Sequence, residues 1–165
     1  MSKKRLVYAA VFCILIGFPL NAATVSFLVI ETGLPQQVPV NHYSAMWENG
    51  LMDVFFEQGY IVSNAPMMRL YEKPEPGLPS DAEKELDVAK EGGVEFFIIA
   101  IVDYPPPKGQ EVLKPQKVSL RLFRVNSSKM LHEQQYMDKT SRSQKEEYDN
   151  LKKAVMALIP HLKDK

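Results

Sequence analysis

The chain has 165 residues, of which 20 are basic and 20 are acidic, so its formal net charge at neutral pH is zero. This length suits one domain and leaves enough chain to bury a sizeable core. Proteins that bind nucleic acid or an anionic membrane surface need clustered lysine and arginine. The balanced charge therefore argues against both, and we expect no nucleic acid partner.

The first 23 residues have the three parts of an export signal. Residues 3–5 (Lys-Lys-Arg) form a positive start, residues 6–20 form an apolar core without charges, and residues 21–23 (Asn-Ala-Ala) offer small side chains to a signal peptidase. The core is shorter than the ~20 apolar residues that span a bilayer. We therefore expect cleavage near Ala23 and a single exported domain at residues 24–165, either periplasmic or secreted. An uncleaved N-terminal anchor in the inner membrane is the alternative.

Cleavage would change the chemistry of the chain. The signal holds basic but no acidic residues, so the mature chain has a net charge of roughly −3. The signal also holds Cys13, the only cysteine, so the mature chain would have no disulfide, thiolate nucleophile or cysteine metal ligand. A lipidated Cys13 would anchor the chain, but Val11 and Phe12 are bulky where lipidation signals have small residues. We expect no stable membrane anchor after signal cleavage.

The first half of the mature chain alternates strand and helix patterns. Residues 25–31 are β-branched, aromatic and almost continuously apolar, which predicts a strand covered on both faces. Residues 42–58 carry apolar side chains at three- and four-residue spacing, typical of an amphipathic helix, and residues 60–63 predict a short second strand. Residues 64–79 are rich in proline and predict a loop. A helix should follow at residues 80–91, which begin with the capping box Ser-Asp-Ala-Glu.

The second half predicts a strand, a hairpin and a closing helix. Residues 94–104 are the most apolar mature segment and predict the central strand, which the prolines at 105–107 end. Residues 117–125 alternate apolar and polar side chains, which predicts a strand with one face in water. After a polar turn, residues 130–137 return as its antiparallel partner. The last helix opens at residue 143 with a second capping box, Ser-Gln-Lys-Glu, and Pro160 should bend or end it.

These elements predict an α/β fold: a mixed sheet of about five strands, three parallel plus an antiparallel hairpin, with packed helices, in the order βαβαβββα. The short βαβαβ unit behind a signal peptide, the hairpin at residues 117–131 (Lys-Val-Ser-Leu-Arg-Leu-Phe-Arg-Val-Asn-Ser-Ser-Lys-Met-Leu) and the closing helix resemble a known group. They look like the periplasmic α/β domains of the curli-secretion lipoprotein, the TolB amino-terminal domain and the penicillin-binding-protein activator lipoproteins. The resemblance is architectural and covers most of residues 24–163. It implies a non-catalytic envelope module that binds other proteins.

The sequence lacks the motifs of common catalytic sites. It has no glycine-rich phosphate loop, no Gly-x-Ser-x-Gly, no Ser-x-x-Lys and no His-Glu-x-x-His, and its three histidines are scattered. We therefore assign no catalytic residue, no cofactor and no metal site. Glu31 and Asp103 are of more interest, because they end the first and the central strand, where ligands bind in open α/β sheets. If the strands are neighbours, the two carboxylates could hold a cation or act as acid and base. Otherwise each ends its strand in solvent.

Apolar loop residues follow the carboxyl ends of the expected parallel strands. If these loops converge, they form an apolar rim of adaptable methionines and rigid prolines, suited to a protein or peptide partner; otherwise they pack down as loop core. The rim residues that we select are Met67, Met68, Leu70, Tyr71, Tyr104 and Pro106. We expect a non-catalytic binding or assembly module of the cell envelope, with another envelope protein or peptide as its partner. The alternative is a small-ligand-binding protein or enzyme that uses Glu31 and Asp103.

Overall fold

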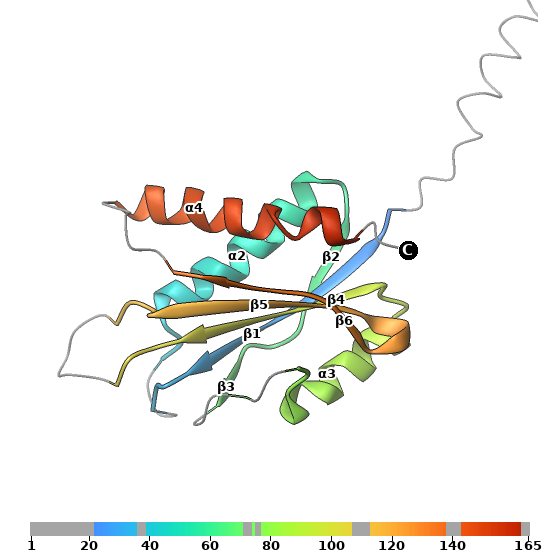
Figure 1. Ribbon diagram of the computed structural model, residues 1–165, viewed down its shortest axis with the longest axis horizontal. Helices are drawn as coiled ribbons and strands as arrows, with labels where there is room; N and C mark the ends of the chain where they lie inside the picture. Colours follow the sequence, from blue (N-terminus) through green and yellow to red (C-terminus); the bar gives the residue numbers. More distant parts are fainter. Residues whose placement is uncertain are drawn as a thin grey trace, which may run out of the picture.

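One mixed sheet carries helices on both faces in the computed structural model, which describes residues 22–35, 39–70, 74, 77–106, 113–137 and 143–162 (Figure 1). Helices α2 and α4 cover one face, and α3 lies on the other. In chain order the elements are β1 (Thr24–Thr32), α2 (His42–Glu57), β2 (Ile61–Asn64), β3 (Met68–Leu70), α3 (Ser80–Glu91), β4 (Phe96–Asp103), β5 (Lys117–Arg124), β6 (Lys129–Tyr136) and α4 (Gln144–Met156).

Most of the expected export signal, residues 1–21 with Cys13, lies outside the described residues. Within the described ranges, no helix combines the length and the apolar character needed to cross a membrane.

The sheet has the strand order β2-β1-β4-β5-β6, and β3 also pairs with β1. Strands β2, β3 and β4 each run parallel to β1, whereas β5 is antiparallel to β4 and β6 is antiparallel to β5. The α/β class and the sheet of parallel strands plus a hairpin are therefore confirmed.

The additional strand, β3, lies inside the segment that the sequence predicts as a loop. β2 pairs with the first half of β1 and β3 pairs with its end, so both lie along the same edge. Between them the Ala65 amide still donates to the Phe27 carbonyl at 2.8 Å, but Pro66 has no N–H to continue the ladder. One edge strand is thus split in two, and its second part places Arg69 beside the end of β1.

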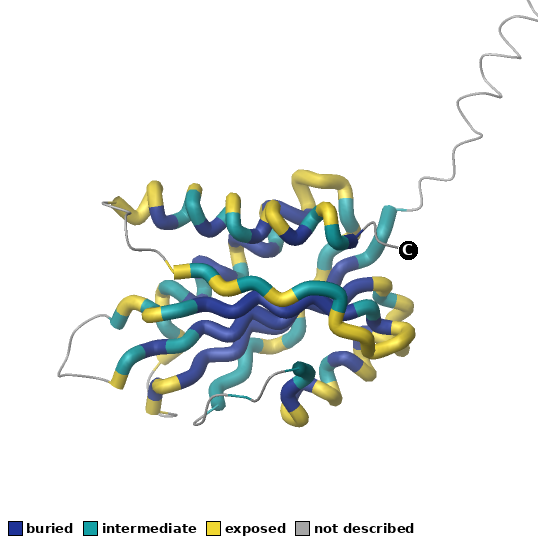
Figure 2. The backbone as a smooth tube through the Cα atoms, viewed as in Figure 1, coloured by how far each residue is buried: buried dark blue, intermediate teal, exposed yellow. Residues whose placement is uncertain are grey.

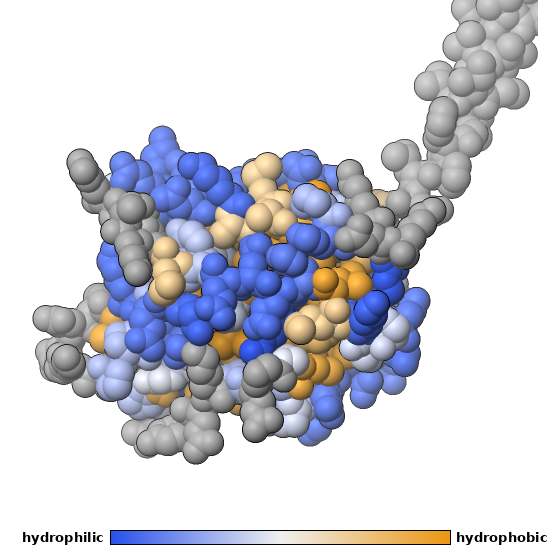
Figure 3. All heavy atoms as spheres, in the orientation of Figure 1, coloured by the Kyte–Doolittle hydropathy of each residue, from blue (hydrophilic) through white to orange (hydrophobic). Residues whose placement is uncertain are grey.

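Strands β1 and β4 are buried on both faces, as their continuous apolar sequences predict (Figure 2). Successive side chains point to opposite faces of a sheet, so they divide between two core clusters. On β1, Val25, Phe27 and Val29 pack with residues of α2 and α4, whereas Leu28 and Ile30 pack with residues of α3. The molecular surface seen in Figure 3 is mainly hydrophilic, with apolar side chains visible only in patches between polar ones.

Helices α2 and α4 lie side by side and run in the same direction. Three side-chain pairs join them in the same order along both helices: His42 with Gln144, Asp53 with Tyr148, and Glu57 with Lys152. The helices pack closely at Gly50, where an added Cβ would lie 2.1 Å from Leu151 Cδ2. The two N-terminal ends therefore lie next to each other at one end of the sheet.

The two predicted capping boxes have different outcomes. Ser143 caps α4, because its Oγ accepts a hydrogen bond from the Glu146 amide at 3.2 Å, as predicted. The prediction that Ser80 caps α3 is wrong. Pro79 occupies the cap position, and its carbonyl already accepts the hydrogen bond from the Ala82 amide, so Ser80 is the first helical residue.

The second face of β5 is not in water, which corrects the prediction from its polar alternation. Ser119 and Arg121 are both buried. The Arg121 guanidinium donates to the Gly77 carbonyl at 2.8 Å and to the Glu133 carboxylate on β6 at 3.0 Å. The backbone at Gly77, just before α3, therefore covers a face that the residue types suggested was solvated.

Gly33, directly after β1, allows the backbone to approach Tyr104 closely. Its φ is +82°, and an added Cβ would lie 2.3 Å from the Tyr104 carbonyl oxygen. We expect Gly33→Ala to lower the free energy of unfolding by about 2–4 kcal/mol, because the left-handed conformation costs alanine ~1–2 kcal/mol and the overlap adds about as much again. Urea unfolding measures the loss.

Gly59→Ala is the matched control, since Gly59 has a φ of +81° but no atom within 4 Å of an added Cβ. Its free energy of unfolding should fall by only about 1–2 kcal/mol, the cost of the left-handed backbone conformation for alanine. Equal losses in the two variants would contradict the close approach at Gly33.

Candidate functional site

Glu31 joins several elements at the end of the sheet where the parallel strands have their carboxyl ends. Its side chain is 1% exposed and forms an ion pair with the Arg69 guanidinium from β3, whose Nε donates to Oε2 at 2.9 Å. The other carboxylate oxygen accepts from the Asn41 backbone amide at 2.8 Å, at the cap of α2. Arg69 also donates to the carbonyls of Pro35, at 3.0 Å, and Pro39, at 3.2 Å. Glu31 therefore ties β1, β3 and the start of α2 together rather than ending its strand in solvent.

Asp103 lies on the opposite face of the sheet from Glu31. It is the register partner of Thr32, and the Thr32 hydroxyl donates to its carboxylate at 3.0 Å. The register partner of Glu31 is Val102. Because neighbouring residues of a strand point to opposite faces, the structure does not bring the two carboxylates together.

The selected rim residues do not converge on one surface. Tyr104 is fully buried, and its hydroxyl shares a 2.7 Å hydrogen bond with Ser44 of α2; burial raises the pKa of this hydroxyl above its ordinary value. Met67 is half-buried against the core cluster of α2 and α4. Met68 and Leu70 are half-buried against the cluster of α3, on the other face.

Pro106 is exposed, and Tyr71 lies outside the described residues. Loop-core packing thus accounts for Tyr104 and in part for the residues around β3.

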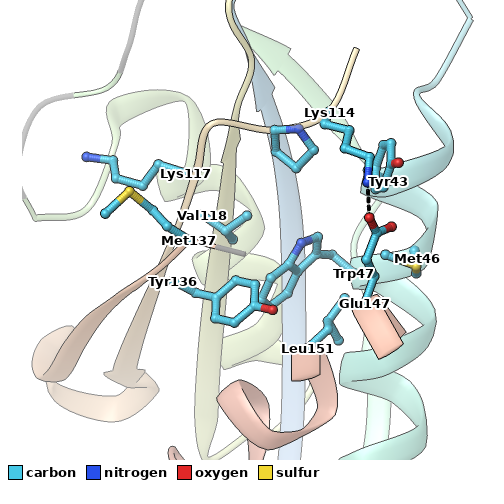
Figure 4. A pocket seen from close by; sticks show the side chains of 11 residues that line it. Tyr43, Met46, Trp47, Lys114, Lys117, Val118, Tyr136, Met137, Glu147 and Leu151 are labelled. Carbon is cyan, nitrogen blue, oxygen red and sulfur yellow. Dashed lines mark hydrogen bonds and ion pairs between the residues drawn. The ribbon is translucent and has the colours of Figure 1, made fainter. Parts of the chain in front are cut away.

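A pocket opens instead on the face covered by α2 and α4, next to the hairpin (Figure 4). We call it the Trp47 pocket; its volume is about 60 Å³. The residues that line it are Tyr43, Met46, Trp47, Lys114, Pro115, Lys117, Val118, Tyr136, Met137, Glu147 and Leu151. The Trp47 and Tyr136 rings meet edge to face, with centroids 5.4 Å apart. Apolar side chains from both helices and both hairpin strands therefore form its walls.

Charged side chains cross the rim of the Trp47 pocket. Lys114 forms an ion pair with the buried Glu147 of α4, and its ammonium lies 5.6 Å from the centroid of the Tyr43 ring of α2. The hydrogen bond to Glu147 raises the pKa of the Lys114 ammonium, so this group stays charged at neutral pH. The Asn41 side chain donates to the Leu113 carbonyl at 3.1 Å, which holds the segment before Lys114 against α2.

The three histidines do not form one site. The His42 Nε2 atom lies 2.6 Å from Gln144 Nε2, between the N-terminal ends of α2 and α4. His132 and His161 stack with ring centroids 3.7 Å apart, a contact that their spacing in the sequence did not predict. Among the residues that the structure describes, no group of three His, Cys, Asp or Glu side chains could hold a metal ion.

No protein-family model and no curated protein sequence matches the chain. Similar solved structures include the PelC dodecamer from Paraburkholderia phytofirmans, at 9% identity over 87% of this chain and 89% of that chain, with a TM-score of 0.44. The LpoB C-terminal domain from Escherichia coli has 11% identity over 80% of this chain and 94% of that chain, with a TM-score of 0.42. TolB from Acinetobacter baumannii has 8% identity over 86% of this chain and 28% of that chain, with a TM-score of 0.41. LpoB and TolB domains, which the sequence pattern resembles, are thus among the solved structures to which the chain is similar in architecture.

Replacing Glu31 tests its structural role. We expect Glu31→Gln to lower the free energy of unfolding by about 2–4 kcal/mol, because the largely buried Arg69 guanidinium loses its charged partner. Asp103→Asn should lose about 1 kcal/mol or less, since the Thr32 hydroxyl can still bond the amide. Urea unfolding measures the free energy of unfolding of both single variants and of the double variant.

The double variant separates a shared site from two independent roles. Losses that add within about 0.5 kcal/mol fit carboxylates on opposite faces. A clearly non-additive double variant would contradict that arrangement.

Proposed function

We propose that the chain is an exported, periplasmic, non-catalytic binding or assembly module of the cell envelope. The export signal read from residues 1–23 supports the location. The observation that carries the binding role is the Trp47 pocket, an apolar recess that remains open at the surface beside charged rim residues. Apolar pockets with a few oriented polar groups are typical recognition sites.

The polar side chains near this end of the sheet serve to hold the fold. Glu31 is bonded to Arg69 and to the start of α2, and Glu147 is paired with Lys114. A small-ligand site or enzyme based on Glu31 and Asp103 needs the two carboxylates to face one pocket, and they lie on opposite faces of the sheet. We therefore propose binding rather than catalysis.

The partner that we propose is another envelope protein or a peptide segment of one. A mature chain with a net charge of roughly −3 is poorly suited to nucleic acid, whose recognition depends on clustered positive charge. The Trp47 pocket is smaller than the usual cavity of ~300–1,000 Å³ that encloses a whole small-molecule ligand. A side chain of a larger partner is a better match for its size.

Processing of the expressed protein tests the location. The full sequence, expressed in a Gram-negative bacterium, should give a periplasmic protein whose N-terminal residue is Thr24, because the apolar core is too short for a stable span. Osmotic-shock fractionation followed by N-terminal sequencing provides the measurement. A protein that keeps residues 1–23 and stays with the inner membrane would support the anchor instead.

Crosslinking in intact cells tests the binding role. A short amine-reactive reagent should convert a fraction of the exported protein into a discrete adduct with one envelope protein, identified by mass spectrometry. The control is the same chain without residues 2–23, which should remain in the cytoplasm and give no such adduct. If the exported protein yields only uncrosslinked monomer in its native host, the binding role is wrong.

A further inference from the structure

We propose that the Trp47 pocket receives one apolar side chain of an extended, acidic peptide segment of the partner. This inference rests on the function proposed above and adds the chemistry of the recognised group. It follows from the size of the pocket, its continuity with neighbouring recesses and the charges around it.

The size of the pocket matches a single side chain. A water molecule needs ~10–15 Å³ of such volume, so about 60 Å³ holds roughly four to six heavy atoms. A leucine side chain or most of a phenyl ring has this size. Trp47, Tyr136 and Met137 offer aromatic and thioether surfaces to such a group.

Two further recesses adjoin the pocket near the starts of α2 and α4. A second recess of about 210 Å³ shares Tyr43, Lys114 and Glu147 with it. A third, of about 450 Å³, shares His42 and Gln144 with the second. An apolar anchor point at one end of a row of neighbouring recesses fits an extended chain better than a compact ligand.

The charged residues of these three recesses are mainly basic. Of the charged residues that the structure describes, Lys114, Lys117 and Lys145 line these recesses, together with the carboxylate of Glu147. Lys114 is 62% exposed, and its ammonium has three donors, so it can bind a second carboxylate while it stays paired with Glu147. A local excess of lysine on a mature chain of net negative charge favours an acidic partner segment at this place.

The rim of the pocket is already held in place. Asn41 fixes the Leu113 carbonyl, and Lys114 joins the same segment to Glu147. Such preorganisation lowers the ordering cost of binding. Met137, by contrast, is 52% exposed at the mouth, where a flexible side chain can adjust to the bound group.

The chain carries its own reporter for this site, because Trp47 is its only tryptophan. Intrinsic fluorescence of the protein expressed from the full sequence can follow a titration with the acetylated, amidated peptide Asp-Glu-Asp-Phe-Glu-Asp, which contains no tryptophan. We expect a saturable change in emission. Replacing the peptide's phenylalanine by alanine should weaken binding by about tenfold or more, because the buried apolar group is lost. Replacing its acidic residues by the corresponding amides should also weaken binding. Raised salt should weaken the binding of the acidic peptide but not that of the amide version.

Three protein variants test the place and the chemistry of binding. Met137→Asp puts a negative charge at the pocket mouth and should abolish saturable binding. Met130→Asp is the matched control, since Met130 lies near the other end of β6, is 39% exposed and does not line the pocket; it should bind as the parent does. Lys114→Gln keeps a donor for Glu147 but removes the positive charge, so it should weaken the acidic peptide and leave its amide version unchanged.

The outcomes separate this inference from the proposed function. Equal affinity for the phenylalanine and alanine peptides, or binding that survives Met137→Asp, would overturn the pocket as the recognition site. If phosphatidylglycerol vesicles change the fluorescence and none of the peptides does, the proposal of a peptide ligand is wrong and a lipid surface is favoured. If the crosslinked envelope adduct persists in Met137→Asp, the binding module stands and the pocket assignment fails.

Discussion

The buried ion pair between Glu31 and Arg69 fixes the geometry on which the rest of the structure depends. Its carboxylate also accepts from the Asn41 amide, and its guanidinium also donates to the carbonyls of Pro35 and Pro39. Such a pair adds little net stability over an apolar replacement, because the desolvation of both charges offsets their attraction. Its effect is on position: it joins the end of β1, the short strand β3 and the first residue before α2, and so determines where α2 starts.

The Trp47 pocket follows from the start of α2. Asn41 caps that helix and holds Leu113, and the segment that begins there carries Lys114 across to Glu147 of α4. Trp47 lies further along α2 and meets the hairpin at Tyr136. The pocket is thus assembled from α2, α4 and the hairpin by contacts between residues far apart in the sequence.

Sequence patterns predict the parts of this protein that depend on continuous or periodic burial: β1, β4, the hairpin and the three helices. They do not predict β3, because three residues beside prolines carry too little pattern, and without β3 the partner of Glu31 cannot be known. The alternation of apolar and polar residues in β5 predicts the strand but not the burial of Arg121. The residue type alone does not show that the segment at Gly77 will cover this side chain. Trp47 has the spacing of an ordinary helix stripe, so the sequence gives no signal that this buried side chain also lines a pocket.

The usual ligand crevice of an open α/β sheet lies beyond the carboxyl ends of its parallel strands, and at this place the described residues that follow β1 and β4 pack closely against each other. The backbone after β1 approaches the Tyr104 carbonyl so closely that only glycine fits at position 33, and the Tyr104 amide bonds the Thr32 carbonyl at 3.0 Å. The Tyr104 side chain then packs under α2 through Ser44. The Trp47 pocket lies next to the hairpin, and lysines and apolar rings are among the residues that line it. The proposed recognition of an acidic peptide segment depends on this combination of lysines and apolar rings.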